Sequence, residues 1–577
     1  MQQLEREKNG MLTHIRDLEK LLQDKGIEVK PYDGHGGVSP DGVRGPNDPN
    51  AEDGWTPIHS LWVKYRNGNL EDTNTVPFLT PNFPRSQLES RPEDTSLGVG
   101  WDSKPLSSIS GTRLRIMGTT IDTASFAAPD MDEPVPDMAG NAPLYNKSVQ
   151  AFLQSAMGIN PPVHVELPSR NDAFTYAEWY FLIMAAYIPC LHKPSFMSTL
   201  SRIYDEPGFQ PAIPELVQIH MVFAIIYYQY GVRNWEDAGR RSHLNELSNK
   251  HYHFSLSKFF DLLTSRELSA IQAMTLIASH TRAFPKPGCG TMVSNLAFQR
   301  AIEMNLHRSP EIPETGTNMA IEMRKRTWWV LLSIYVSVTG RRGRPMPITV
   351  EEFDVGLPEP LNDDALLEDG IDKSKADNPC EWEVGLTTMK MMPIMMEMYS
   401  NIYSVRRDTQ NYKKIVYALE GELNKWEDEL PDRLRVEKIE QHDQHNLAAL
   451  YIKMFGEEIR LWLRHNSVNP TTDKAMMAEN TRICEDTARS LLHTVQKIIE
   501  LKSLDTTWTQ MSIYAMSLFS MLVAGWERRF ETTPEQLATL RREMDEWLDV
   551  LKELSLLMGK SLMPLRCASP QSIRLPL

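Results

Sequence analysis

The sequence predicts an all-α protein, in which a large multi-helix domain follows a short coiled coil and a mostly disordered linker. From residue 146 onward, apolar residues recur at spacings of three and four, the pattern of helices with one buried face. Ile415, Leu419, Leu423, Trp426 and Leu430 are one example. We find neither an alternation of strands and helices nor a repeat of fixed period. The chain has 577 residues, more than one compact core usually holds, so appendages to the folded region are expected.

Residues 1–30 are predicted to form the short coiled coil. Leu4, Met11 and Leu18 occupy one core position of a heptad repeat, and Ile15 and Leu22 occupy the other. Roughly three heptads can bring two chains together, although that length is only marginally stable alone. We therefore expect a homodimer formed through residues 4–25. The alternative is a solitary amphipathic helix that packs on its own domain.

Residues 31–145 are rich in glycine and proline and are predicted to be a linker. Such a composition buries too little apolar surface to offset the entropy of ordering the chain. Within the linker, residues 111–126 place Leu114, Ile116 and Ile121 at strand-like spacings around a glycine. A short strand or hairpin is expected there, as a docking segment for the folded region.

Residues 146–577 are predicted to be helical. The expected helices are 171–188, 215–231, 255–263, 267–283, 294–306, 321–339, 387–407, 411–429, 445–465, 472–501, 506–529 and 534–557. Pro393 interrupts the methionine-rich run 389–398, so a kink or a helix boundary is expected there. Without an accompanying Cys or His, that run indicates adaptable packing more simply than a copper site.

Charge and composition exclude several classes of protein. The net charge of -15 argues against the overall basic surface of a stand-alone nucleic-acid binder. The longest apolar runs, 174–191 and 216–230, contain polar residues and Pro189, so buried helices are expected and no membrane span. Five cysteines are scattered without metal-ligand spacing, which predicts reduced thiols and no metal ligands. These are Cys190, Cys289, Cys380, Cys484 and Cys567.

Catalytic motifs are absent from the sequence. It has no phosphate-binding glycine loop, no nucleophile elbow and no zinc-binding HExxH helix, so no catalytic or cofactor-binding residues are expected. One alternative is an all-α, magnesium-dependent diphosphate enzyme, which would use Asp363, Asp364, Glu368 and Asp369. These carboxylates lie between glycine and proline residues, so a solvated connector is the better interpretation. Another alternative is a helical protein-protein adaptor.

The stretch from Glu322 to Ile348 carries the densest pattern in the chain. Glu322 and Arg326 are four residues apart, and a weak ion pair on an exposed helix face is expected. Trp328 and Trp329 begin a large apolar stripe that predicts a buried helix face. Arginines follow the helix in a turn, where they would bind an acidic partner or the carbonyls of the helix end. The residues alone favour a scaffold over a ligand site.

Four motifs then follow one another in order: Tyr180–Phe196, Ala297–Pro310, Glu322–Ile348 and Glu351–Pro360. Together they resemble the middle homology region of fungal zinc-cluster transcription factors, a xylanolytic-activator-like regulatory domain, with a motif core at 170–364. Asn305 stands where that family usually has glycine. The resemblance implies a role in the helical scaffold for the positions that match: Pro194, Phe196, Ala301, Leu306, His307, Arg308, Arg324, Arg326, Trp328, Trp329, Gly343, Arg344, Pro345, Asp354, Leu357 and Pro358.

The resemblance also implies a function. It implies a nuclear regulator of RNA polymerase II transcription that contacts the transcription machinery. Members of the family bind DNA through an N-terminal module of six cysteines and two zinc ions, and the five scattered cysteines here cannot form one. We therefore expect no cofactor in this chain, and zinc only in a module encoded upstream or carried by a partner. This chain would supply the dimerisation and regulatory parts.

Overall fold

A computed structural model describes residues 113–116, 119–122, 149–158, 165–233, 237–282, 287–313, 316–340, 346–403, 411–438, 446–465, 473–505 and 508–558. The prediction of an all-α protein is confirmed over these ranges, where helices dominate. The predicted coiled-coil positions Leu4, Met11, Ile15, Leu18 and Leu22 lie outside the described residues, as do Gly343, Arg344 and Pro345.

The described residues contain fifteen α-helices. Their bounds are α4 Val149–Ala156, α5 Arg170–Ile183, α6 Lys193–Asp205, α7 Ile213–Arg233, α8 Ala238–Ser257, α9 Phe259–Thr264, α10 Leu268–Arg282, α11 Pro287–Glu303, α12 Met319–Gly340, α13 Glu383–Asn401, α14 Tyr412–Asp428, α15 Asn446–Arg464, α16 Lys474–Glu500, α17 Trp508–Glu527 and α18 Pro534–Met558. Short 3-10 turns lie at Val350–Glu352, Asp363–Ala365, Asp432–Leu434 and Val436–Lys438.

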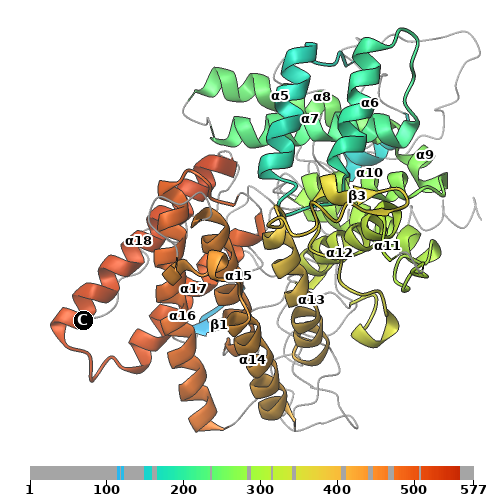
Figure 1. Cartoon of the computed structure of the whole chain (residues 1–577). Coiled ribbons are helices and arrows are strands. Elements are labelled where there is room, and N and C mark those ends of the chain that lie inside the picture. The colour runs from blue at the N-terminus through green and yellow to red at the C-terminus, as the bar shows by residue number, and fades with distance from the viewer. Residues whose placement is uncertain are drawn as a thin grey trace, which may run out of the picture. The chain divides into compact units, whose positions relative to one another are not determined.

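The helices pack mostly against their neighbours in the sequence. Helix α7 packs on α5, α8 and α10, and α10 packs in turn on α11 and α12. Helix α13 contacts α12 on one side and α14 and α15 on the other, so it joins the green helices of Figure 1 to the orange and red ones. Helices α15, α16, α17 and α18 follow in sequence, each against the next. One cluster of buried apolar side chains extends through all of these helices.

Three helices are missing from the expected set, namely α4, α6 and α8, and α8 was missed because much of the face that it buries is polar. Helix α8 buries Ser248, His251, His253 and Ser255, so its inner face does not show an apolar period. Ser248 Oγ donates to the carbonyl of Ala224 in α7 at 2.7 Å, which ties the two helices without apolar side chains. Helix α6 buries only Phe196 and Leu200, too few apolar side chains to show a helical period, and α4 has only eight residues.

Several helix boundaries differ from the predictions, among them the start of α11, which lies at Pro287 and not at residue 294. The helix expected at 171–188 ends at Ile183, and the chain then turns. The carbonyl of Ala186 in this turn accepts from the backbone of Gly385 at 3.1 Å, so the start of α13 uses a group that a longer α5 would keep inside its helix. No boundary occurs at Pro393, because α13 continues through it.

Four short strands accompany the helices in the described residues. Strand β1 (Arg113–Ile116) pairs antiparallel with β2 (Thr119–Asp122), with Leu114 opposite Ile121. This pair lies in the segment where a strand or hairpin was expected, and its docking on the folded region stays a prediction. Strands β3 (Leu366–Leu367) and β4 (Gly370–Ile371) form a second antiparallel pair just after the 3-10 turn at Asp363–Ala365.

Candidate functional site

Charged side chains in the first two turns of α12 are buried, so the prediction of an exposed ion pair was wrong. Glu322 and Arg326 are both 0% exposed, and each binds other partners. Glu322 Oε1 accepts from Lys325 Nζ at 3.0 Å and from Thr317 Oγ1 at 2.6 Å. Its Oε2 accepts from the backbone N–H of Glu359 at 2.8 Å. Glu322 thus fixes the start of α12 to the segment that carries the fourth motif.

Arg326 makes the second connection from α12. Its Nη1 donates to Asp363 Oδ1 and its Nη2 donates to the carbonyl of Leu361, each at 2.5 Å. The guanidinium also lies 4.4 Å from the ring centre of Trp382. The other oxygen of Asp363 accepts from the backbone N–H of Lys193 at 2.7 Å, at the start of α6. Arg326 and Asp363 therefore join α12, the Asp363–Ala365 turn and α6.

Asp363 corrects a second prediction, that the acidic cluster is a solvated connector. Its carboxylate is engaged on both oxygens by the groups just described. Asp364 has an exposed side chain beside Lys375, as expected for a connector. Within the described residues, no three His, Cys, Asp or Glu side chains lie close enough to hold a metal ion.

Arg324 caps the end of α11. Its guanidinium donates to the carbonyl of Asn305 and, at 3.4 Å, to that of Met304. The N–H of Leu306 bonds back to the carbonyl of Ala301 at 2.9 Å, the bond that closes a helix with one left-handed residue. Asn305 is that residue, with φ of 57°. Glycine and asparagine both tolerate this conformation, which explains why asparagine replaces the family's usual glycine here.

His307 and Asp354 hold two motif segments together. The carbonyl of His307 accepts from the backbone N–H groups of Asp354 and Val355, at 3.2 and 3.3 Å. Asp354 Oδ1 accepts from the backbone N–H of Ser309 at 2.8 Å. The pKa of His307 is lowered by burial and by the positive charge of Arg308.

The two tryptophans lie in the core of the domain. Trp328 packs on Phe298 and Phe353, with ring centres 5.2 and 5.9 Å away. Trp329 Nε1 donates to the carbonyl of Gly356 at 3.0 Å. Among the other matching positions, Phe196, Leu306 and Pro358 are buried, whereas Pro194 and Arg308 are exposed. We propose that the described matching positions form a scaffold.

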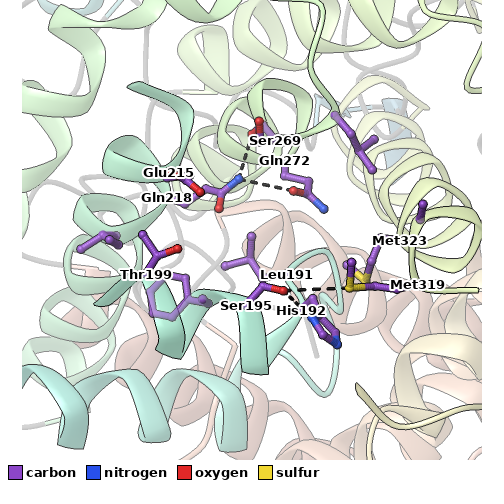
Figure 2. A pocket seen from close by; sticks show the side chains of 14 residues that line it. Leu191, His192, Ser195, Thr199, Glu215, Gln218, Ser269, Gln272, Met319 and Met323 are labelled. Atoms are coloured by element: carbon purple, nitrogen blue, oxygen red, sulfur yellow. Dashed lines mark hydrogen bonds between the residues drawn. The ribbon is translucent and has the colours of Figure 1, made fainter. Parts of the chain in front are cut away.

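A groove of about 300 Å³ lies beside this scaffold, between α6, α7, α10 and α12 (Figure 2). Its wall mixes apolar residues such as Met319 and Met323 with amides and hydroxyls. Gln218 crosses it and donates to the carbonyl of Ser269 at 2.9 Å and to Gln272 Oε1 at 3.4 Å. Two of the four motifs, Tyr180–Phe196 and Glu322–Ile348, contribute residues to this groove, but they did not predict it, because the other lining residues come from separate segments.

Ser195 and His192 form a hydrogen-bonded pair in the groove, with Ser195 Oγ 2.7 Å from His192 Nδ1. His192 Nε2 lies 2.9 Å from the carbonyl oxygen of Asp363, which only accepts. In the neutral ring, Nε2 therefore carries the proton and Nδ1 accepts from the serine. His192 precedes the first turn of α6 and Ser195 lies within that turn, so the bond joins two side chains at the start of the helix, while Asp363 accepts from the backbone N–H of Lys193. A hydrolytic triad would instead orient the ring with a carboxylate.

The charged links of α12 and the groove beside it lie in one segment that also carries a recognisable family signature. Residues 177–428 match the fungal specific transcription factor domain. The chain carries this domain. The match begins within α5 and ends with the last residue of α14, so it contains Glu322, Arg326, Asp363 and the groove. The resemblance inferred from the four motifs is therefore confirmed.

Proteins that carry names of transcription regulators are similar to this chain. "Activator of stress genes 1" of Saccharomyces cerevisiae is 22% identical over 361 residues, which cover 60% of this chain and 36% of that protein. "Fusaridione A cluster transcription factor fsdR" of Fusarium heterosporum is 23% identical over 350 residues, 59% of this chain and 64% of that protein. "Transcriptional activator protein acu-15" of Neurospora crassa is 21% identical over 275 residues, 48% of this chain and 28% of that protein.

In these three comparisons, the aligned residues cover between 28% and 64% of the relative's own length. Large parts of these relatives therefore lie outside the comparison. Among the helices of the described ranges, none is both long enough and apolar enough for a membrane crossing.

Proposed function

We propose that this chain supplies the dimerisation and regulatory parts of a fungal transcription regulator, which acts in the nucleus on RNA polymerase II transcription. The observation that carries the proposal is the match over residues 177–428. The relatives named above support it, since each name describes an activator or a transcription factor. The buried charges of α12 give the matched segment a fixed geometry, which suits a module that transmits regulation through its surfaces.

The proposal divides the work between segments. Residues 4–25 form a homodimer, and DNA is bound through a six-cysteine zinc cluster encoded upstream or carried by a partner. The sequence supports this division, because its five cysteines are too few for such a cluster. Sedimentation of the chain against a Leu18→Lys variant tests the dimer: we expect dimers for the former and monomers for the latter, and equal masses would contradict it.

We propose no catalytic function for this chain. A magnesium-dependent diphosphate enzyme would need Asp363 free to bind metal, but both of its oxygens accept hydrogen bonds from the scaffold. The alternative of a helical protein-protein adaptor would bind partner proteins without a change in transcription. A cytoplasmic location in fungal cells would favour the adaptor.

The function is tested by fusing the full chain to a heterologous DNA-binding domain and measuring a reporter gene in a fungal host. We expect reporter transcription to change at least severalfold relative to the DNA-binding domain alone in at least one nutrient condition. The fusion must be shown to be expressed and nuclear by microscopy and immunoblotting. An unchanged reporter in all nutrient conditions would overturn the proposal.

A further inference from the structure

A second cavity, of about 80 Å³, is lined by residues of α12, α13, α15 and α17. It lies outside the groove of Figure 2, with which it shares no residue. Gln510 of α17 and Trp462 of α15 line it together with Arg282, Glu458 and Asp505. Three methionines of α13 form an apolar part of its wall.

Two of these residues have polar atoms without a protein partner. Gln510 is 1% exposed, and neither its amide oxygen nor its amide nitrogen has a hydrogen-bond partner among the described residues. The indole Nε1 of Trp462 is likewise buried and unpartnered there. Buried polar atoms in proteins are nearly always paired, so three such atoms on the residues of one cavity point to something that binds in it.

The donor or acceptor character of these atoms specifies which groups a bound molecule must have. Trp462 Nε1 and Gln510 Nε2 are donors, so they need an acceptor group on the occupant. Gln510 Oε1 is an acceptor, and the carboxylates of Glu458 and Asp505 line the same cavity, so a donor group is needed as well. Arg282 adds a positive charge to the lining. A molecule with a negative and a positive end meets both requirements.

We propose that this cavity binds a small free α-amino acid. Its carboxylate accepts from Trp462 Nε1, Gln510 Nε2 and Arg282, and its ammonium group donates to Gln510 Oε1 and Glu458. The aliphatic part packs against the methionines, whose flexible side chains adapt to different shapes. One water fills roughly 10 to 15 Å³ of such a volume, so the cavity holds roughly five to eight non-hydrogen atoms.

Binding of an amino acid in this cavity does not depend on the proposed function, whereas a role of that binding in regulation rests on it. The cavity lies where α13 and α15 meet, and α13 also packs on α12. An amino acid bound there would contact α12 and α13 on one hand and α15 and α17 on the other. Regulation by the ligand would then appear in the reporter assay as a response to that amino acid.

The test is isothermal titration calorimetry of the full-length protein with glycine, alanine, serine, threonine, proline and valine. We expect saturable binding of at least one of them. Gln510→Leu and Trp462→Phe should each weaken it at least tenfold, since each removes a donor to the carboxylate. Gln272→Leu, in the groove of Figure 2, should leave it unchanged. The corresponding amino-acid amide should bind more weakly than the free acid.

Absence of binding up to 10 mM for all six amino acids would overturn the proposal and assign the cavity to water. Wild-type affinity in Trp462→Phe would also overturn it, and that variant serves as the test if Gln510→Leu does not fold. Weakened binding in Gln272→Leu alone would move the site to the groove and contradict the assignment. Failure of the reporter assay with intact amino-acid binding would reject the proposed function and keep the site.

Discussion

Asp363 and Asp364 are adjacent in the sequence, but the structure gives them different surroundings. The side chain of Asp363 is 19% exposed and pairs with Arg326, whose side chain is 1% exposed. We expect Asp363→Ala to lower the free energy of unfolding by about 3 to 5 kcal/mol, because the buried guanidinium loses its carboxylate. The start of α6 also loses an acceptor. Urea denaturation followed by circular dichroism measures the change.

Asp364→Ala is the matched control. The side chain of Asp364 is 52% exposed, and its nearest cation, Lys375 Nζ, is 3.6 Å away. Removal of such a carboxylate is expected to change the free energy of unfolding by less than about 0.5 kcal/mol. Equal losses in the two variants would contradict the buried ion pair as the source of the effect.

Glu457 makes the free energy of unfolding depend on pH, and substitution of this one residue isolates the effect. Burial raises the pKa of Glu457 from 4.5 to about 7, although Ser490 donates a hydrogen bond to it. Between these values the unfolded carboxyl is ionised and the folded one is protonated, so stability falls as pH rises. Glu457→Gln carries no charge, and its stability relative to the wild type should rise by about 3 kcal/mol from pH 4 to pH 8.

The measurement is urea denaturation of both proteins across that pH range. The two proteins can differ in free energy of unfolding at every pH, because the amide and the protonated carboxyl differ slightly in hydrogen bonding. The test is therefore how that difference changes with pH. A difference that stays constant from pH 4 to pH 8 would show that Glu457 ionises normally in the folded protein.

Helices α7 and α8 meet through a pair of buried histidines. The Nδ1 atoms of His220 and His251 are 2.9 Å apart, so one donates and the other accepts, and at least one ring must be neutral. The rings that face the pair are Phe223, Tyr227 and Phe254. Burial lowers the pKa of His251 to about 4 and that of His220 well below 6.5.

This pair makes the contact between α7 and α8 sensitive to acid. Between pH 6.5 and about 4, the unfolded histidines bind protons that the folded pair does not accept, so stability falls as pH drops. We expect the double variant His220→Phe, His251→Phe to lose less stability over this window than the wild type does, as measured by urea midpoints. Identical slopes in the two proteins would refute the role of the pair.

Helices α12 and α13 approach closely at Gly340, the last residue of α12. A methyl group placed there would overlap the buried ring of Tyr399 in α13. We expect Gly340→Ala to destabilise the protein by about 1 to 3 kcal/mol, because a packed core accommodates added volume poorly. Thermal unfolding followed by calorimetry measures the shift.

Gly421 in α14 is the matched control for Gly340. A methyl group there meets nothing within 4 Å. Gly421→Ala is expected to stabilise the protein by about 0.5 to 1 kcal/mol, because alanine restricts the unfolded chain and favours the helix. A stabilising effect of both substitutions would contradict the close approach of α12 and α13.

The whole molecule carries a net charge of -15, which bears on its interaction with DNA. Binding to DNA needs several lysines and arginines opposite phosphates, and specificity needs side chains placed at base edges. We expect the 577-residue chain alone to show no sequence-specific DNA binding at physiological salt. Repeated selection of bound duplexes from a random-sequence pool, followed by sequencing, checks this, and enrichment of one sequence would disprove it.

The sequence by itself determined the class, most of the helices and the family of the domain. Helical periodicity is a local property, so segments such as α14 and α15 were predicted within a few residues of their observed ends. The four motifs in their order identified the domain, and the match over residues 177–428 contains all of them. Asn305 adopts the left-handed conformation that glycine tolerates, so the helix end is kept although the residue differs.

Only the tertiary structure decided which charged and polar groups are buried. Arg326 and Asp363 are 37 residues apart in sequence, and no local pattern predicts that they form an ion pair in which the arginine is buried and the aspartate half-buried. Helix α8 was missed because its buried face is polar, and its partners lie on α7. The groove and the second cavity each collect residues from several helices. Burial of a polar group depends on partners that the fold brings from afar, and local sequence patterns carry no record of those partners.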